Sequence, residues 1–329
     1  MNLTIYILYL SYFFLFSNGF FNFFKNIRTK RCNLILQNSN YPYAKEYYDF
    51  YRKYKGPIIQ SNKNINFDTF AKKNIEKYKL FEKNINSINE ANELLKNNNN
   101  SFTLDINKYT DTIDFDNSST NDLMNNPIVD KRFRPNAYLK IFQRPFPYIE
   151  TIIRQNKNFT YNWNTTGLLS PVKNQGHCGS CWAFSSVSAM ETFMRINGYY
   201  ITRLSEQELV DCSKDNFGCE GGFMHLAFDY IMKNNGLVSH DKYPYIAKDQ
   251  ECSIYKHRKV SGSQLSDYQF TIPKSILDMK LNVIQTPISI ALDADNIFFR
   301  FYKNGVIDIP ENYSSTMNHA VLLVGFDYD

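Results

Sequence analysis

The sequence lacks a block of basic residues. Its 329 residues carry 37 Lys and Arg against 32 Asp and Glu, a net charge of +5, and the basic residues interleave with Asn and Tyr. A nucleic-acid partner needs a concentrated basic patch, so we expect none. The chain also lacks a second C-x-x-C or an H-x-x-x-H at ligand spacing. This argues against the alternative of zinc bound by His177, Cys178 and Cys181, and we expect no metal.

No Lys or Arg precedes the long apolar run at the N-terminus. The stretch Leu3 to Phe16 is almost entirely apolar, and small residues follow it. This pattern predicts a signal peptide over residues 1–19. Because the run extends to Phe24 and basic residues follow it, an uncleaved membrane anchor is the alternative. Both interpretations place the chain in the secretory pathway, where disulfides form.

Six cysteines are present, and two of them lie three apart within the stretch Gln175 to Phe184. Apolar residues recur behind Cys181 at spacings of three and four, which predicts a helix with Ser180 as its N-cap. Cys181 then lies in the first helical turn, where unpaired N–H groups and the macrodipole favour negative charge. We therefore expect a lowered thiol pKa and a nucleophilic thiolate.

This stretch matches the pattern C-G-[SA]-C-[WY] of papain and the cathepsins. The chain resembles a precursor of a papain-family cysteine peptidase of the cathepsin L type. The resemblance implies an α+β fold over residues 156–329, with a helical left lobe and a β-barrel-like right lobe. A helical propeptide over residues 20–155 would precede it. The implied reaction is peptide-bond hydrolysis through a thiolate and an acyl-enzyme, without a cofactor.

The residues after the nucleophile change character along the chain. Ser205 and Glu208 form a capping box before a short helix, and residues 223–233 predict another helix. Further on, the β-branched and apolar runs at 287–292 and 319–326 predict strands. A helical first half and a β-rich second half indicate two packed lobes with a cleft between them.

The resemblance also implies disulfides. If Cys181 is the free nucleophile and Cys32 lies outside the catalytic domain, four cysteines remain, and the sequence alone allows three ways of pairing them. The family pattern, carried onto matching positions, pairs Cys178 with Cys219 and Cys212 with Cys252.

His319 is the candidate base among the five histidines. It opens a predicted strand, within the distance of about 130–150 residues after the cysteine that is typical of this family. An imidazole there can take the thiol proton and later protonate the leaving amine. A hydrogen-bonded structural histidine is the alternative. The resemblance gives Gln175 the role of oxyanion donor, together with the backbone N–H of Cys181.

The third catalytic group of the family, an asparagine followed by a tryptophan, has no counterpart in this sequence. None of the residues Gly325 to Asp329 fits that role. We interpret the sequence as a catalytic domain truncated in its β-rich lobe, and we expect an open sheet edge there. A catalytically inactive homologue that acts as a propeptide-type peptidase inhibitor or binding protein is the alternative function.

Residues 70–95 resemble part of the helical E-R-F-N-I-N pattern of cathepsin-L-type propeptides. Lys73 and Lys77 replace the Glu and Arg of that pattern, and the segment Asp105 to Asp111 resembles the G-x-N-x-F-x-D element that follows it. We expect this segment to dock on the catalytic domain and to block the cleft until cleavage. An unrelated amphipathic helix is the alternative. The matching positions are Phe81, Asn84, Ile88 and Asn92.

Substrate contacts are expected at positions that match the family. Two adjacent glycines allow an extended substrate to approach the backbone closely, although an ordinary glycine turn is the alternative. Apolar side chains would line the pocket for the second residue before the scissile bond (P2), where we expect Leu, Val or Phe. No insertion resembles one that blocks the cleft, so we expect endopeptidase cleavage. The expected contacts are Gly221, Gly222, Phe223, Met224, Ala291, Met317 and Ala320.

The resemblance further implies protein and peptide substrates, the chain's own propeptide as inhibitor, cystatin-like inhibitors as other partners, and a monomer. It places the protein in a lysosome, in a digestive vacuole or outside the cell. Sequons at Asn158, Asn164 and Asn312 predict a glycoprotein.

Overall fold

The computed structural model describes residues 3–7, 41–56, 66–97, 102–112, 147–156, 158–199, 203–309 and 317–328. The predictions for Cys32 and Asn312 lie outside these residues. The chain divides into two compact units: unit 1 holds Met1–Ser11, Asp116–Ala294 and Asn312–Asp329, and unit 2 holds Tyr12–Phe115 and Asp295–Glu311. In the described ranges, no helix combines the length and apolarity that a membrane span requires.

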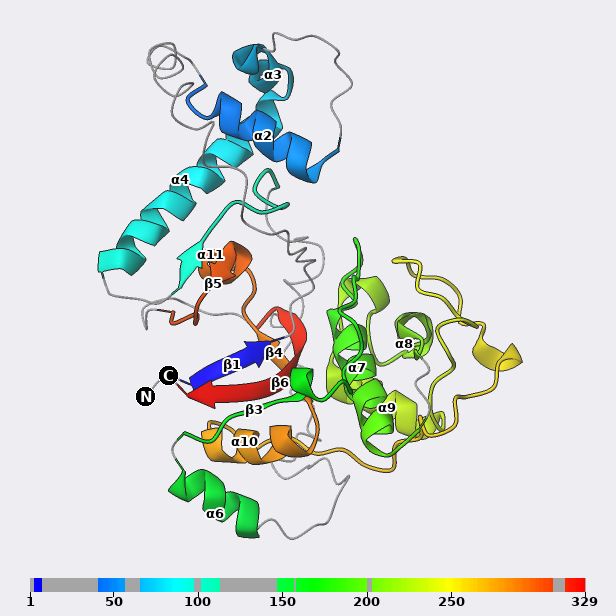
Figure 1. Ribbon diagram of the computed structural model, residues 1–329. Helices are drawn as coiled ribbons and strands as arrows, with labels where there is room; N and C mark the ends of the chain where they lie inside the picture. The colour runs from blue at the N-terminus through cyan, green and yellow to red at the C-terminus, as the bar shows by residue number, and fades with distance from the viewer. Residues whose placement is uncertain are drawn as a thin grey trace. The chain divides into compact units, whose positions relative to one another are not determined.

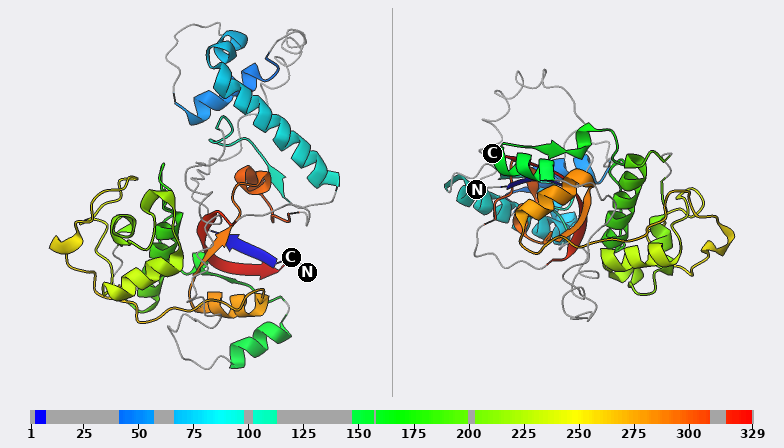
Figure 2. Two further views of the ribbon diagram at one scale, coloured as in Figure 1. Left: turned by 180° about the vertical axis from the view of Figure 1, so that it is seen from behind. Right: turned by 90° about the horizontal axis from the view of Figure 1, so that it is seen from below.

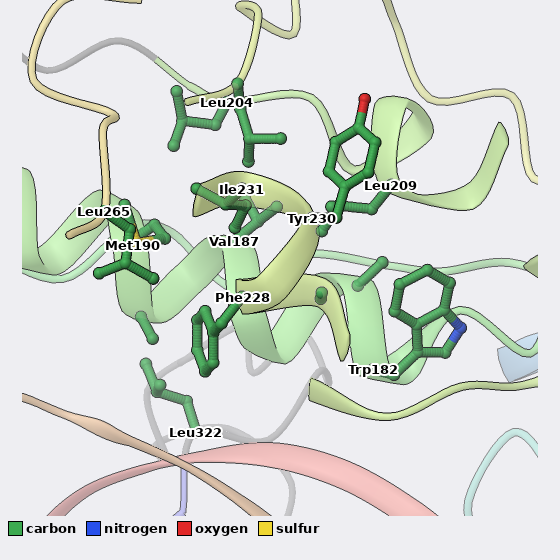
Figure 3. Close-up of a cluster of buried hydrophobic side chains, with 14 of the residues drawn as sticks. Trp182, Val187, Met190, Leu204, Leu209, Phe228, Tyr230, Ile231, Leu265 and Leu322 are labelled. Atoms are coloured by element: carbon green, nitrogen blue, oxygen red, sulfur yellow. The ribbon is translucent and has the colours of Figure 1, made fainter. Parts of the chain in front are cut away.

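The helical lobe of unit 1 is built from α7 (Cys181–Ile196), α8 (Glu206–Cys212) and α9 (Met224–Lys233). Side chains at the predicted spacing on α7, among them Val187 and Met190, are buried against α9 and against Leu322 (Figure 3). Ser205 caps α8 as predicted, since its hydroxyl accepts a hydrogen bond from the Glu208 N–H at 3.0 Å. This core fixes the start of α7 and therefore the position of Cys181.

The second lobe of unit 1 is an antiparallel sheet around β6 (His319–Tyr328). The strand β4 (Ile288–Leu292) pairs with the first half of β6, and β3 (Tyr161–Asn162) pairs with its second half. The strand β1 (Leu3–Ile7) also pairs with the second half of β6. Phe326 pairs with both Ile5 and Tyr161, so β1 and β3 flank β6 on opposite sides. Figures 1 and 2 show this sheet beside the α7–α9 helices.

The partner strand β1 comes from the N-terminal run. Its sequence, Leu-Thr-Ile-Tyr-Ile, is rich in β-branched and aromatic residues, which favour strands. Since β1 pairs along the last residues of β6, the sheet edge that we expected to be open is covered by this strand. The assignment of residues 1–19 to a signal peptide stays a prediction.

Smaller elements complete unit 1. Trp163 is buried and donates its indole N–H to the Val283 carbonyl. This bond holds the segment around Trp163 against the helix α10 (Ile276–Gln285). Residue Ser275 caps α10 through the Asp278 N–H. These elements are α6 (Pro147–Gln155), α10 (Ile276–Gln285) and the 3₁₀ turns Trp163–Thr165, Gly218–Glu220 and Ile254–Lys256.

Unit 2 contains the segment that resembles a propeptide. The single helix expected over 70–95 is wrong at its start, because α3 (Phe67–Lys73) ends at Asn74 and α4 (Ile75–Asn97) begins after it. Asn74 leaves the helical conformation and its side chain donates to the Phe70 carbonyl, which closes the first helix. The remaining elements of this unit are α2 (Ala44–Tyr54), β2 (Thr103–Leu104), α11 (Ile297–Arg300) and β5 (Tyr302–Asn304).

The four matching positions on α4 hold unit 2 together. Phe81 and Ile88 are buried. The Asn84 amide donates to the carbonyls of Thr110 and Thr112, and Asn92 exchanges hydrogen bonds with the backbone of Leu104. The two asparagines thus bind the segment 102–112 along α4, which gives the repeated pattern a structural reason in this chain.

Candidate active site

Cys181 and His319 lie at the starts of two elements of unit 1 that pack against each other. Cys181 is the first residue of α7, and His319 is the first residue of β6. The Cys181 sulfur accepts a hydrogen bond from the backbone N–H of Ala320, the residue after His319. The Ser185 hydroxyl, one turn along α7, donates to the Val321 carbonyl at 2.8 Å. These bonds hold the start of α7 against the start of β6.

Burial sets the protonation of both groups. It raises the pKa of the Cys181 thiol, although the N–H groups of Ala320, Trp182 and Cys181 itself oppose this. The expectation of a lowered thiol pKa is therefore wrong, because desolvation outweighs the helix N-terminus. Burial also lowers the pKa of His319 to about 4. The pair in this structure is a neutral thiol and a neutral imidazole at pH 7.

The loop before α7 is braced by a tyrosine that the sequence analysis did not single out. The Tyr245 hydroxyl donates to the Gln175 carbonyl at 2.6 Å and lies 2.6 Å from the Ser180 hydroxyl. Its ring packs edge-on against Phe184, with ring centroids 4.8 Å apart. The Ser180 hydroxyl therefore hydrogen-bonds to Tyr245 and does not cap α7, so its predicted role as a cap is wrong. The motif Tyr243-Pro244-Tyr245 was the only available signal.

Gln175 lies on this loop. Its side-chain amide donates to the Cys178 carbonyl at 2.9 Å. A carboxamide NH₂ has two donor hydrogens, so one remains to bind an oxyanion. Cys178 forms a disulfide with Cys219, and Cys212 forms one with Cys252, the two bridges that the resemblance implies. Cys181 is the free cysteine of the described residues.

Asn318 is a second residue whose role the sequence did not reveal. Its side-chain oxygen accepts from the Ala294 N–H at 2.8 Å, and its backbone N–H donates to the Leu292 carbonyl at 3.0 Å. Asn318 is buried and joins the end of β4 to the start of β6. It thereby fixes the backbone that carries His319.

The two adjacent glycines have separate structural reasons. Gly221 has a φ of +119°, a conformation that residues with a Cβ rarely adopt. A Cβ on Gly222 would lie 2.5 Å from the Asn216 side-chain oxygen and 2.7 Å from the Trp182 ring. The backbone at Gly222 can therefore approach the residue next to Cys181 only because no side chain intervenes.

Three of the expected P2 residues, Phe223, Met224 and Ala291, line one cavity of about 210 Å³ in unit 1. Met317 and Ala320 do not line it. Met317 is 45% exposed, whereas Ala320 is buried and its N–H faces the thiol. Ala291 lines the cavity and pairs across the β4–β6 ladder with Ala320, whose N–H acts on the thiol.

A buried ion network of Lys173, Glu191 and Glu206 holds the loop that carries Gln175. Lys173 lies 2.9 Å from a Glu191 carboxylate oxygen and 2.6 Å from one of Glu206. Burial would raise the pKa of Glu206, but His240 and Lys173 outweigh it and leave this pKa below its usual value. Since Glu191 belongs to α7 and Glu206 opens α8, Lys173 ties the Gln175 loop to both helices.

The chain is similar to known sequences of one family. The family profile described as "Papain family cysteine protease" matches residues 158–329. Procathepsin L of Rattus norvegicus is 35% identical over 252 residues, which cover 76% of this chain and 71% of that protein. Cathepsin L2 of Homo sapiens is 42% identical over 173 residues, which cover 51% of each chain. The chain therefore spans about half the length of this second relative.

Solved structures are similar as well. The digestive procathepsin L2 proteinase from Tenebrio molitor larval midgut superposes with a TM-score of 0.62 at 28% identity, over 87% of this chain and 86% of that one. The recombinant stem bromelain precursor gives a TM-score of 0.60 at 27% identity, over 88% and 83% of the two chains. Both similarities extend beyond residues 158–329, since they cover most of this chain.

Proposed function

Because this chain belongs to the papain family of cysteine proteases, as a cathepsin L-like precursor, we propose that it is the zymogen of a cysteine endopeptidase with Cys181 as nucleophile and His319 as base. The observation that supports the proposal is the packing of the start of α7 against the start of β6, where the Ser185 hydroxyl donates to the Val321 carbonyl at 2.8 Å and the Ala320 N–H lowers the pKa of the Cys181 thiol.

In the proposed mechanism, the neutral His319 imidazole accepts the thiol proton as the Cys181 sulfur attacks the substrate carbonyl carbon. The new C–S bond forms while the carbonyl electrons move onto oxygen. Collapse of this intermediate breaks the C–N bond, and the imidazolium returns its proton to the leaving amine. Water then hydrolyses the thioester with His319 again as base, which restores the thiol.

The oxyanion of each intermediate would receive two donors. One is the free hydrogen of the Gln175 amide, and the other is the backbone N–H of Cys181 at the start of α7. Tyr245 and the Cys178–Cys219 bridge support this arrangement, because they fix the loop that carries Gln175. Loss of one such donor typically costs about 10²–10³ in rate.

Unit 2 supports an inhibitory propeptide. The segment after α4 contacts residues 297–307, which belong to the stretch that the family profile matches. The Asp105 N–H donates to the Phe301 carbonyl at 2.9 Å, and the Asn107 amide donates to the Arg300 carbonyl at 2.7 Å. The propeptide-like segment therefore has a binding surface within the protease sequence itself. Two disulfides favour a secretory, lysosomal or extracellular location.

The proposed activity predicts selectivity at P2. After removal of the propeptide, peptides with Leu, Val or Phe at P2 should be cleaved about 10- to 100-fold faster, as kcat/KM, than peptides with Asp or Lys there, because the cavity beside Ala291 is mainly apolar. A P2 substrate series measures this ratio. Lys233→Met is the control, since Lys233 is exposed at the end of α9 and does not line this cavity, so the ratio should stay unchanged. Equal rates for apolar and charged P2 residues would refute the assignment.

The His319 pKa predicts the acid limb of activity. A general base must be neutral to accept a proton, and burial keeps this imidazole neutral down to about pH 4. For an uncharged substrate, kcat/KM should therefore stay level from pH 7 to about pH 5 and fall below about pH 4. The exposed His177 lies in the same loop as Gln175, and His177→Asn should leave this limb in place. A limb near pH 6.5, the ordinary histidine value, would contradict the prediction.

A further inference from the structure

One tyrosine hydroxyl joins the two positions that carry the proposed oxyanion donors. The Tyr245 hydroxyl oxygen lies 2.6 Å from the Gln175 carbonyl oxygen and 2.6 Å from the Ser180 hydroxyl. Gln175 carries the side-chain donor, and Ser180 directly precedes Cys181, whose backbone N–H is the other donor. The phenol is therefore placed to set the separation of the two donors.

The hydrogen bonds of this phenol have only one possible direction. A carbonyl oxygen cannot donate, so the single phenol hydrogen goes to Gln175. The Ser180 hydroxyl must then donate to the Tyr245 oxygen. Burial raises the pKa of Tyr245 to about 12, so the phenol keeps its proton at neutral and acid pH. The two hydrogen bonds run in one direction from Ser180 to Gln175, an arrangement in which each strengthens the other.

The segment around Tyr245 is held by a buried side chain of α8. Gln207 is buried, accepts from the Ile246 N–H at 2.9 Å and donates to the Lys248 carbonyl at 2.7 Å. The Tyr245 ring packs edge-on against Phe184 of α7, with ring centroids 4.8 Å apart. The phenol is therefore fixed by contacts that do not depend on the loop before α7.

The same segment comes close to the loop at a second point. A Cβ on Gly176 would lie 3.1 Å from the Ala247 Cβ, so the absence of a side chain at Gly176 lets the two segments approach. Ala247 has a φ of +56°, which is uncommon for a residue with a Cβ. Such conformations persist where surrounding contacts hold them. The segment thus meets the loop at the Gln175 carbonyl and again at the next residue.

We propose that Tyr245 is a positioning residue, whose hydroxyl sets the separation of the two oxyanion donors. The proposal rests on the proposed peptidase function. Tyr245 acts through Gln175 and Ser180 and makes no contact with the reacting atoms. Misplacement of a catalytic group by about 1 Å can cost about 10²-fold in rate. The hydroxyl therefore contributes to the reaction rate as well as to the stability of the loop.

Tyr245→Phe tests the proposal, because it removes the hydroxyl and keeps the ring. After propeptide removal, kcat should fall about 10- to 100-fold while KM stays within about 3-fold, because oxyanion contacts act in the transition state. Tyr230→Phe is the matched control, since it loses one buried phenol hydrogen bond in the same lobe, to Glu208 at 3.0 Å. It should keep kcat within about 3-fold of the parent, as expected for a change away from the site.

A double-mutant cycle separates positioning from general loosening. Gln175→Ala removes one donor and should lower kcat about 10²- to 10³-fold. In this background Tyr245→Phe should cost less than about 3-fold, because the separation of two donors matters only when both are present. Alkylation of Cys181 by iodoacetamide forms no oxyanion, so Tyr245→Phe should leave its rate within about 3-fold of the parent.

Amide hydrogen exchange in the full chain, read by mass spectrometry, tests the contact without catalysis. The Gly179 N–H donates to the Cys219 carbonyl at 2.8 Å, so it exchanges when the loop opens. Tyr245→Phe should speed this exchange about 3- to 10-fold, the worth of one ordinary hydrogen bond. Tyr230→Phe should leave the exchange unchanged.

Three results would overturn the proposal: unchanged exchange in Tyr245→Phe, a kcat within about 3-fold of the parent, or full additivity with Gln175→Ala. An equal loss of kcat in Tyr230→Phe would overturn it as well. Absence of all hydrolysis by the parent would instead refute the peptidase function, and the exchange experiment would still decide whether Tyr245 holds the loop.

Discussion

Replacement of Cys181 by alanine is expected to lower kcat/KM by about 10⁴- to 10⁶-fold once the propeptide is removed, because no other group can form the acyl-enzyme. Cys181 is the free cysteine of the described residues, and the backbone N–H of Ala320, the residue after His319, acts on its sulfur. The change removes one atom from a buried position, so the fold should survive. Steady-state hydrolysis of a peptide with an apolar P2 residue measures the effect.

The control for this experiment is His177→Asn. His177 is exposed and lies in the same loop, and we assign it no part in the reaction. It should retain activity within about 3-fold, as expected for a surface change with little effect on stability. If Cys181→Ala kept more than about a hundredth of the activity, covalent catalysis by this thiol would be refuted.

Replacement of Lys173 by methionine should destabilise the chain by about 3–5 kcal/mol, because it removes the cation shared by two buried carboxylates and leaves only His240 beside Glu206. Glu191 and Glu206 are buried, and both lie within 3 Å of the Lys173 ammonium. The loop that carries Gln175 should loosen as well. Urea unfolding of the full chain, followed by tryptophan fluorescence, measures the loss of stability.

Lys233→Met is the matched control. Lys233 and Asp215 form an ion pair 3.3 Å apart, but their side chains are 62% and 59% exposed. Such pairs contribute about 0–1 kcal/mol, so this variant should unfold close to the parent. If Lys173→Met fails to fold, adding Glu191→Gln and Glu206→Gln should restore a cooperative transition. Equal losses in Lys173→Met and Lys233→Met would contradict the role of the network.

The sequence predicted the two lobes and the positions of α7, α8 and β6, and its cysteine motif led to the family, whose pattern implied both disulfides. It did so because the cysteine motif, the capping box at Ser205 and the β-branched run after His319 each depend on local chemistry. The family pattern also located the asparagines of α4, although the structural reason for them appears only in their bonds to residues 102–112.

The sequence could not predict features that depend on long-range packing. Ser180 has the right type for a cap, but Tyr245 competes for its hydroxyl. The position of Cys181 at a helix start predicted a lowered thiol pKa. Burial raises this pKa instead, and the degree of burial depends on tertiary packing.

The central claim is that Cys181 is a working nucleophile in a peptidase released by removal of its propeptide. The most direct test is labelling of the full chain with a thiol-directed epoxide before and after that removal, followed by peptide mass mapping. The account predicts that Cys181 is labelled after removal, that the label increases as activity is lost, and that labelling slows in His319→Ala. A Cys181 that stays unlabelled after propeptide removal would contradict the account and favour an inactive inhibitor or binding protein.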